Sequence, residues 1–159
     1  MPDLNSCSTA TPSSMGHNAQ TLMAFDFGTQ KMGIAIGQTQ ITSATPLSLF
    51  PMKDGIPQWD QLLKIVKQWQ PQLCIVGLPL NMDGSESELS ARARKFARRL
   101  RHQTNIETVM VDERLTTREA RQQLEYYQEK GQAKRLSADS FAAALLIERW
   151  YREPQGVKP

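Results

Sequence analysis

Acidic residues stand at three points of this chain where a folded protein could hold reactive carboxylates. Asp26 ends an apolar run that begins at residue 21, Asp112 and Glu113 follow an apolar run at 107–111, and Asp139 opens the apolar C-terminal stretch. An acid that ends an apolar run is rarely buried without a partner or a metal ion. Converging carboxylates repel one another unless cations neutralise them, and Mg²⁺ prefers such oxygen ligands. The pattern predicts a site for Mg²⁺ or Mn²⁺. Two such ions about 3.5–4 Å apart can promote phosphodiester cleavage.

Each acidic position also has a structural interpretation, and the residues alone leave both open. Asp26 could bind nearby backbone N–H groups in a turn. Asp139 would be favoured at the start of a helix by the helix dipole. Asp112 and Glu113 could form a solvated turn with Arg114. Side chains alternate along a strand, so we expect only one of these two acids to join a common site.

The elements that must position these acids can be located from hydrophobic periodicity. Strands are predicted at 21–27, 32–37, 41–50 (an edge-like strand that contains Pro46), 73–77 and 107–111. Four helices are predicted, the first at 58–69 and the last from Ala138 to about Tyr151. The second begins after a capping box of Ser85 and Glu88, and its core face consists of Leu89, Ala93, Phe96, Ala97 and Leu100. The third begins after a capping box of Thr116 and Glu119 and ends near Gly131. Hairpin strands followed by alternating helices and strands predict an α/β fold with a mixed sheet between helices.

Composition fits one folded domain of 159 residues. Residues 1–20 are polar and are predicted to be a disordered extension, residues 21–152 the folded domain, and residues 153–159 a flexible tail. Two cysteines, the absence of a secretory signal and a mean hydropathy of -0.47 predict a cytoplasmic protein without a membrane span. A net charge of +3 indicates, weakly, an anionic partner.

Basic residues that could contact phosphates fall in two places. Arg92, Lys95 and Arg99 share one face of the predicted second helix, whereas Lys130, Lys134 and Arg135 lie in or beside the segment before Asp139. That segment leads directly to a candidate catalytic acid, so we expect its side chains to hold nucleic acid more than the helix face does. The helix face could instead be ordinary solvated surface.

Glycines flank the turn after Asp26. Gly28 and Gly33 could supply positive φ angles or let phosphates approach the main chain, or they could serve a plain tight turn.

Four stretches together resemble the YqgF family of Holliday-junction-resolvase-like proteins, which are also described as pre-16S rRNA nucleases. They read DFGTQKMGIAIG, VGLPLNMDGSESE, VDERLTTREA and ADSFAAALL, and they occur in the order and approximate spacing seen in that family. The resemblance covers about residues 22–151. Its specificity rests mainly on GLPLNMDG and DERLTT.

The resemblance implies an RNase H-like fold: a five-stranded mixed sheet, with strand two antiparallel, flanked by helices. It also implies a cytoplasmic, metal-dependent nuclease that processes the 5′ end of pre-16S rRNA. The metal-binding and catalytic acids would be Asp26, Glu113 and Asp139. Nucleic-acid contacts would be expected at residues beside these acids: Gly28, Thr29, Lys31, Arg114, Lys130, Lys134 and Arg135. Gln30 departs from the family pattern, in which a basic residue is common before Lys31.

Other functions remain compatible with the sequence. A DNA junction resolvase would meet similar phosphates, and a noncatalytic RNA-binding factor in ribosome assembly could retain the same fold. An ATPase related to sugar kinases or actin shares the glycine-bearing hairpin after Asp26. Such enzymes need two domains around ATP, however, and this chain has the length of one.

Overall fold

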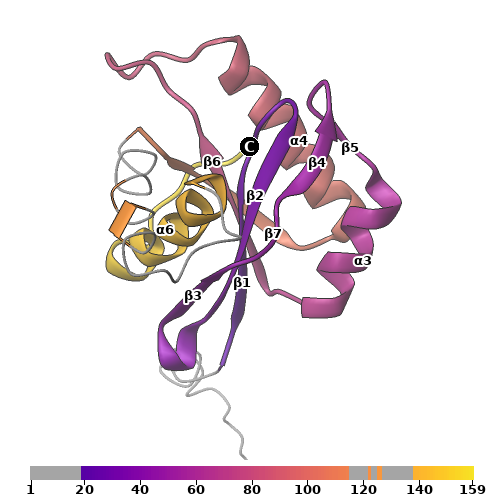
Figure 1. Cartoon of the computed structure of the whole chain (residues 1–159), viewed down its shortest axis with the longest axis vertical. Helices are drawn as coiled ribbons and strands as arrows, with labels where there is room; N and C mark the ends of the chain where they lie inside the picture. Colours follow the sequence, from indigo (N-terminus) through magenta and orange to yellow (C-terminus); the bar gives the residue numbers. More distant parts are fainter. Residues whose placement is uncertain (1–18, 115–121, 123–124, 127–137) are drawn as a thin grey trace, which may run out of the picture.

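The computed structural model describes residues 19–114, 122, 125–126 and 138–159. These residues form one twisted sheet with helices on both faces (Figure 1). The predicted extension lies outside the described residues except for its last two positions. Most of the predicted helix from Thr116 to Gly131 and the basic segment with Lys130, Lys134 and Arg135 also lie outside them.

The sheet is mixed, and its second strand is antiparallel to the first, as predicted. Its strands are β1 (Thr21–Asp26), β2 (Lys31–Gln38), β3 (Ser43–Pro46), β4 (Phe50–Lys53), β5 (Ile56–Pro57), β6 (Leu73–Leu78) and β7 (Glu107–Asp112). The spatial order is β5-β4-β2-β1-β6-β7, with β3 also paired to β2. β1 pairs in parallel with β6, and β6 in parallel with β7. The carboxyl ends of these three strands therefore meet at one edge of the sheet.

The number of strands differs from the prediction, because the described residues form seven strands rather than five. The predicted strand at 41–50 is wrong as a single element. Residues Thr39–Ile41 form a 3₁₀ turn (η1), β3 ends at Pro46, and the chain then enters a separate hairpin of β4 and β5. The hairpin turns at Asp54 and Gly55, whose φ angles are 50° and 77°. Two positive φ angles at an Asp-Gly pair are typical of the tight turns that join twisted strands.

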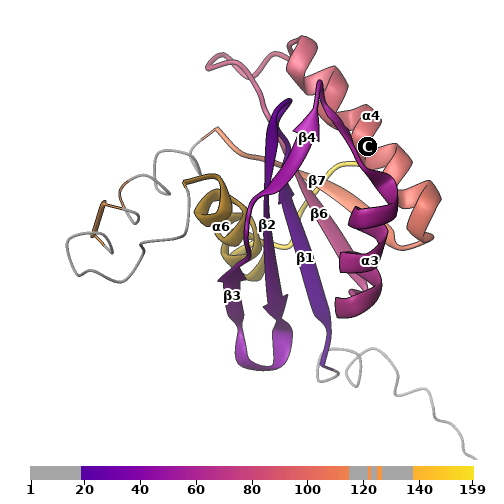
Figure 2. The ribbon, with the colours of Figure 1, turned by 45° about the vertical axis from the view of Figure 1, so that its right-hand side comes forward.

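Helices cover the two faces of the sheet unequally. Figure 2 shows α6 (Ala138–Arg152) on one face, with α3 (Trp59–Trp69) and α4 (Glu88–Thr104) on the other. α6 is buried continuously over residues 140–147 and packs mainly on β2, β1 and β3, which confirms the prediction of a central, largely apolar helix. The opposite face is filled by Met, Val and aromatic side chains, including Phe25, Phe27 and Phe96. None of the described helices is long and apolar enough to cross a membrane.

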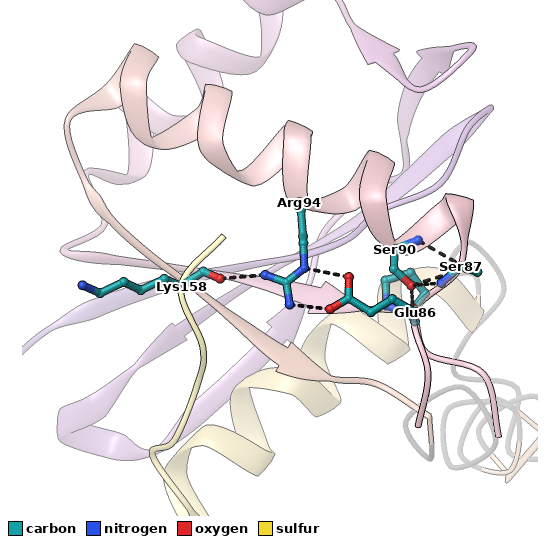
Figure 3. A network of polar contacts seen from close by, with 6 residues as sticks. Glu86, Ser87, Ser90, Arg94 and Lys158 are labelled. Atoms are coloured by element: carbon teal, nitrogen blue, oxygen red, sulfur yellow. Dashed lines mark hydrogen bonds and ion pairs between the residues drawn. The ribbon is translucent and has the colours of Figure 1, made fainter. Parts of the chain in front are cut away.

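The start of α4 differs in detail from the prediction. Ser87 and Ser90, rather than Ser85 and Glu88, form the capping box, and the helix begins at Glu88 (Figure 3). The hydroxyl of Ser85 instead donates to the Asp83 carboxylate at 2.6 Å, which holds it in the preceding loop. Leu89, in the first turn of α4, is 38% exposed, so its assignment to the core is wrong.

The C-terminal segment lies along the sheet, although a flexible tail was predicted at 153–159. The backbones of Met110 and Val157 exchange two hydrogen bonds, of 2.8 and 2.9 Å. Arg94 donates to the carbonyl of Lys158 at 2.9 Å and binds both carboxylate oxygens of Glu86 (Figure 3). Arg94 therefore connects α4, the loop before it and the chain terminus.

Candidate active site

Asp26 is the last residue of β1 and lies at the carboxyl-end edge of the sheet. Side chains alternate along the strand, and Leu22 and Ala24 pack in the core beneath α6. Asp26 has the same parity, so it faces the α6 side. Its register partner on β2 is Gly33.

Asp139 is brought to this edge by the close packing of α6 on β2. A Cβ atom at Gly33 would overlap the backbone carbonyl of Asp139, so glycine is required for this approach. The Ser140 hydroxyl donates to the carbonyl of Leu47 at 2.8 Å and fixes the first turn of the helix. The register of Asp26 with Gly33 therefore places the start of α6 over the first carboxylate.

Glu113 reaches the same edge from the far side of β6. It follows β7 and is 8% exposed. A Cβ atom at Gly77 would overlap the Glu113 carboxylate, which shows that this side chain lies over β6 at the glycine. Because β6 separates β1 from β7, the missing side chain at Gly77 opens the space through which Glu113 approaches Asp26.

The Asp26 and Glu113 carboxyl groups share a hydrogen bond. Burial and, next, the neighbouring Asp26 raise the pKa of Glu113 to about 10, so the pair retains a proton at neutral pH. Burial also raises the pKa of Asp26, to about 6, with a smaller contribution from repulsion by Asp139 and against the effect of the Glu113 hydrogen bond. Asp26 and Glu113 thus meet where access of water is restricted and share a proton, while Asp139 lies beside them with its side chain 37% exposed.

Asp112 points away from this group, as strand alternation predicts. Its carboxylate accepts hydrogen bonds from Arg114, the shortest of 2.7 Å, and Arg149 donates to its backbone carbonyl at 2.8 Å. Partial burial alone would raise the pKa of Asp112, but its hydrogen bonds with Arg114 hold that pKa below the ordinary value. Glu113, and not Asp112, therefore joins the carboxylate cluster, by which we mean Asp26, Glu113 and Asp139.

The basic residues among the predicted nucleic-acid contacts divide into three groups. Lys31 lies beside the cluster, with its ammonium 3.6 Å from the Asp139 carboxylate and its side chain 60% exposed. Arg114 is engaged by Asp112 and by the carbonyl of Met82 at 3.3 Å, so it supports the loop after β6. The third group, Lys130, Lys134 and Arg135, lies outside the described residues.

The turn between β1 and β2 contains Gly28 and Thr29, and of the roles considered for its glycines only the positive φ angle is wrong. Neither Gly28 nor Gly33 has a positive φ angle. Gly28 is needed because a Cβ there would overlap the carbonyl of Lys31. The Thr29 carbonyl accepts a hydrogen bond of 2.8 Å from the N–H of Gly55, which ties the turn to the β4–β5 hairpin.

The donor set fits a divalent cation in its chemistry. All three side chains offer carboxylate oxygens, and their crowding favours a cation that would replace the shared proton. As the side chains stand, no three acidic, histidine or cysteine residues in the described part of the chain are arranged to hold one ion. Asp139 is turned towards Lys31 instead.

Gly77 is the site residue that the sequence interpretation missed. Its signal was present, because a glycine inside the apolar run LCIVG marks a place where another group approaches the strand. The approaching group, Glu113, is 36 positions later, so its identity could not be inferred from local pattern.

Comparison with known proteins finds similar sequences that extend over most of the chain. A family model described as RuvX, Holliday junction resolvase, matches residues 20–153. A protein of Acinetobacter baylyi named "Putative pre-16S rRNA nuclease" is 77% identical over 148 residues, which are 93% of this chain and 99% of that protein. A protein of Saccharophagus degradans with the same name is 47% identical over 135 residues, 85% of this chain and 95% of that protein.

The fold also has a relative among solved structures. RuvC of Thermus thermophilus, in complex with a Holliday junction substrate, superposes with a TM-score of 0.54 at 14% identity, covering 88% of this chain and 99% of that one. The same protein solved as "Thermus thermophilus RuvC structure" gives the same score at 12% identity, over 86% of this chain and 98% of that one. The likeness supports the RNase H-like assignment of the fold.

Proposed function

The chain belongs to the RuvX (YqgF) family, and from that premise we propose that it is a metal-dependent nuclease that processes the 5′ end of pre-16S rRNA. The observation that carries the proposal is the carboxylate cluster, in which Asp26 and Glu113 are buried against each other beside Asp139. The naming of close relatives as pre-16S rRNA nucleases supports the choice of substrate. Processing of a ribosomal precursor would place the protein in the cytoplasm.

Within the cluster the three acids have different positions and are proposed to have different tasks. Asp26 and Glu113 are held rigidly by β1, β6 and β7, so they would fix the position of Mg²⁺ or Mn²⁺. Asp139 is more exposed and would complete the ligand set on the side that faces the substrate. When bound, two such ions supply Lewis acids that stabilise the charge developing at the scissile phosphate. Glu113 must lose its proton before it can serve as a ligand.

Substrate phosphates would be held beside the cluster by groups that do not read bases. Lys31 lies on the exposed side of Asp139, and the backbone of Gly28 and Thr29 lies at the adjacent turn. Lys130, Lys134 and Arg135 precede α6 in the sequence, and we include them in the proposed phosphate contacts. Contacts of this kind position a strand and leave sequence selection to other features of the RNA.

A second candidate is cleavage of branched DNA. The family model is described as a Holliday junction resolvase, and the carboxylate cluster would act on either kind of backbone. A bound but uncleaved RNA would instead indicate a noncatalytic assembly factor.

The test measures cleavage by the purified full chain in Mg²⁺ or Mn²⁺. Its substrates are RNA carrying the 5′ boundary of 16S rRNA, a four-way DNA junction, and single-stranded DNA of matched length. We expect the RNA to be cleaved at a defined position and Asp26→Asn to reduce the rate by more than about 100-fold, since removing supporting groups of metal sites already reduces activity by 10–100-fold. In metal-free buffer Asp26→Asn should unfold at the same or a higher temperature, because the cluster loses repulsion.

Asp60→Asn is the matched control, because Asp60 is an exposed acid in the first turn of α3. It should cleave like the parent. Parental activity in Asp26→Asn would remove Asp26 from catalysis. Selective cleavage of the junction would favour the resolvase, and binding of RNA without cleavage by the parent would favour the assembly factor.

A further inference from the structure

A recess lies on the face of the sheet opposite α6, between α4 and the β4–β5 hairpin. Its cavity volume is about 270 Å³, slightly below the range of about 300–1,000 Å³ typical of pockets for drug-sized ligands. Its wall and mouth are formed mainly by Gly55, Trp59, Lys95 and Arg99. We call it the α4 pocket. Its size suits a small group, such as one phosphate with part of its sugar.

The charge of the α4 pocket is positive. Lys95 and Arg99 are one helical turn apart and exposed. Asp54 is the one acid among its described lining residues, and Arg92 binds it at 3.1 Å. Arg92 therefore neutralises the acid and holds the hairpin in place, which leaves Lys95 and Arg99 to bind an anion.

Arg99 is held in a defined orientation by an aromatic stack. Its guanidinium lies 5.3 Å from the centre of the Trp59 ring, and Trp59 is stacked on Phe96 with 5.8 Å between ring centres. The ring of Phe96 also packs on that of Phe27, the residue after Asp26, with 5.5 Å between ring centres. A cation fixed on an aromatic face loses less side-chain entropy when it binds a phosphate.

Hydrogen bonds connect the α4 pocket to the turn beside the carboxylate cluster. Gly55, in the pocket wall, donates to the carbonyl of Thr29 at 2.8 Å, and Met52 donates to the carbonyl of Gln30 at 2.9 Å. The β1–β2 turn thus lies between the two sites, with Asp26 at one end and the hairpin at the other. Figure 1 shows the hairpin of β4 and β5 at the same end of the sheet as the β1–β2 turn.

We propose that the α4 pocket binds a backbone phosphate of an unpaired segment of the nucleic-acid substrate, next to the cleaved phosphodiester. This inference rests on the proposed nuclease function and adds a second contact point to it. The strand would cross the β1–β2 turn from the carboxylate cluster to Lys95 and Arg99. A single strand fits better than a duplex, because a flexible backbone can bend into a recess and track a basic groove.

The decisive variant is Lys95→Gln/Arg99→Gln, with Arg98→Gln/Arg101→Gln as the matched control. Both remove two exposed positive charges from α4, and the control residues do not line the α4 pocket. Binding of a fluorescent 12-nucleotide RNA would be measured by anisotropy across a range of salt, in EDTA to stop cleavage. The slope of log affinity against log salt should fall by about 0.7 in the pocket variant, since the pocket holds one phosphate and each single-strand phosphate contact contributes about 0.7. The control should keep the parental slope.

A second measurement reports directly on binding in the α4 pocket. The indole N–H signal of Trp59, assigned with Trp59→Phe, should shift when the RNA is added, and it should shift less in the pocket variant. Equal slopes in the pocket and control variants, with no shift at Trp59, would overturn the inference. If the parent still cleaves in an Asp26-dependent manner, the proposed function survives that result. A parent that neither binds nor cleaves nucleic acid would refute both.

Discussion

The two faces of the sheet hold opposite charges in opposite environments. On the α6 face, Glu113 is buried and Asp26 is half-buried, the two share a proton, and glycines at positions 33 and 77 leave room for the acidic residues. On the α4 face, Lys95 and Arg99 are exposed, and Arg99 lies over the ring of Trp59. The two kinds of charge therefore lie in the environments that suit their proposed roles. A metal-binding acid benefits from close packing and exclusion of water, whereas a phosphate contact needs solvent access and reach.

The dependence of the acidic face on close packing is tested most severely by Gly33→Val. The new side chain would overlap the Asp139 backbone, so α6 must move away from β2. We expect a loss of about 3 kcal/mol or more in the free energy of unfolding, together with loss of cleavage. Urea denaturation and the nuclease assay measure the two effects. The control is Gln38→Val, which places a valine at an exposed position of the same strand. Stability like that of the control would mean that α6 does not rest on Gly33.

The buried acids should make the metal-free protein less stable as pH rises. Folding raises the pKa of Asp26 to about 6 and that of Glu113 to about 10, so the folded state keeps protons that the unfolded state has released. Between about pH 4 and pH 10, stability should fall by on the order of 1.4 kcal/mol per pH unit for each retained proton. Urea titrations in EDTA at several pH values would show this.

Two variations sharpen the pH experiment. Glu113→Gln removes the group with the larger pKa shift, so the plot of stability against pH should become flatter. Mg²⁺ should stabilise the parent most at high pH, because a metal ion binds the deprotonated acids. A parental curve that is already flat in EDTA would show that the cluster does not retain protons in solution.

Gly77→Ala tests the passage through which Glu113 reaches Asp26. The added methyl would meet the Glu113 carboxylate, and we expect a loss of about 1–3 kcal/mol in stability with reduced cleavage. A double-mutant cycle with Glu113→Ala isolates the conflict, because most of the loss should disappear in that background. An equal loss in both backgrounds would place the conflict elsewhere, for example at Leu146.

The smallest effect on stability is expected at the exposed ion pair of the acidic face. Lys31 and Asp139 are 3.6 Å apart and both solvated, so Lys31→Gln should change the free energy of unfolding by less than about 1 kcal/mol. Lys64→Gln, at an exposed position of α3, is the control. A loss of several kcal/mol would show that Lys31 neutralises the buried acids and does more than pair at the surface.

Elements with strong periodicity could be predicted from sequence, whereas contacts across the sheet could not. β1, β2 and α6 were found because their apolar patterns are long and regular. The β4–β5 hairpin was missed although Asp54-Gly55 is a turn signal, because its strands are short and contain Pro51 and Pro57. The shift in capping at α4 arose because Ser85 has a competing partner in Asp83.

In the candidate site, too, some residues could be predicted from the sequence and others could not. The three acids of the cluster were named from their places at the ends of elements and from the family resemblance. The role of Gly77 and the α4 pocket depend on which residues meet across strands and between α4 and the hairpin. Trp59 and Arg99 are 40 positions apart, and only the fold brings them together.

The backbone pairing of Val157 with Met110 has a consequence for the behaviour of many copies of this chain. Among the described strands, β7 lies at the edge of the sheet, so its outer N–H and C=O groups would otherwise offer a template for strand addition by another molecule. The C-terminal segment occupies part of that template, and Arg94 keeps it there through the carbonyl of Lys158. This pairing shortens the stretch of β7 that is open to pairing with another molecule, which is expected to disfavour edge-to-edge aggregation.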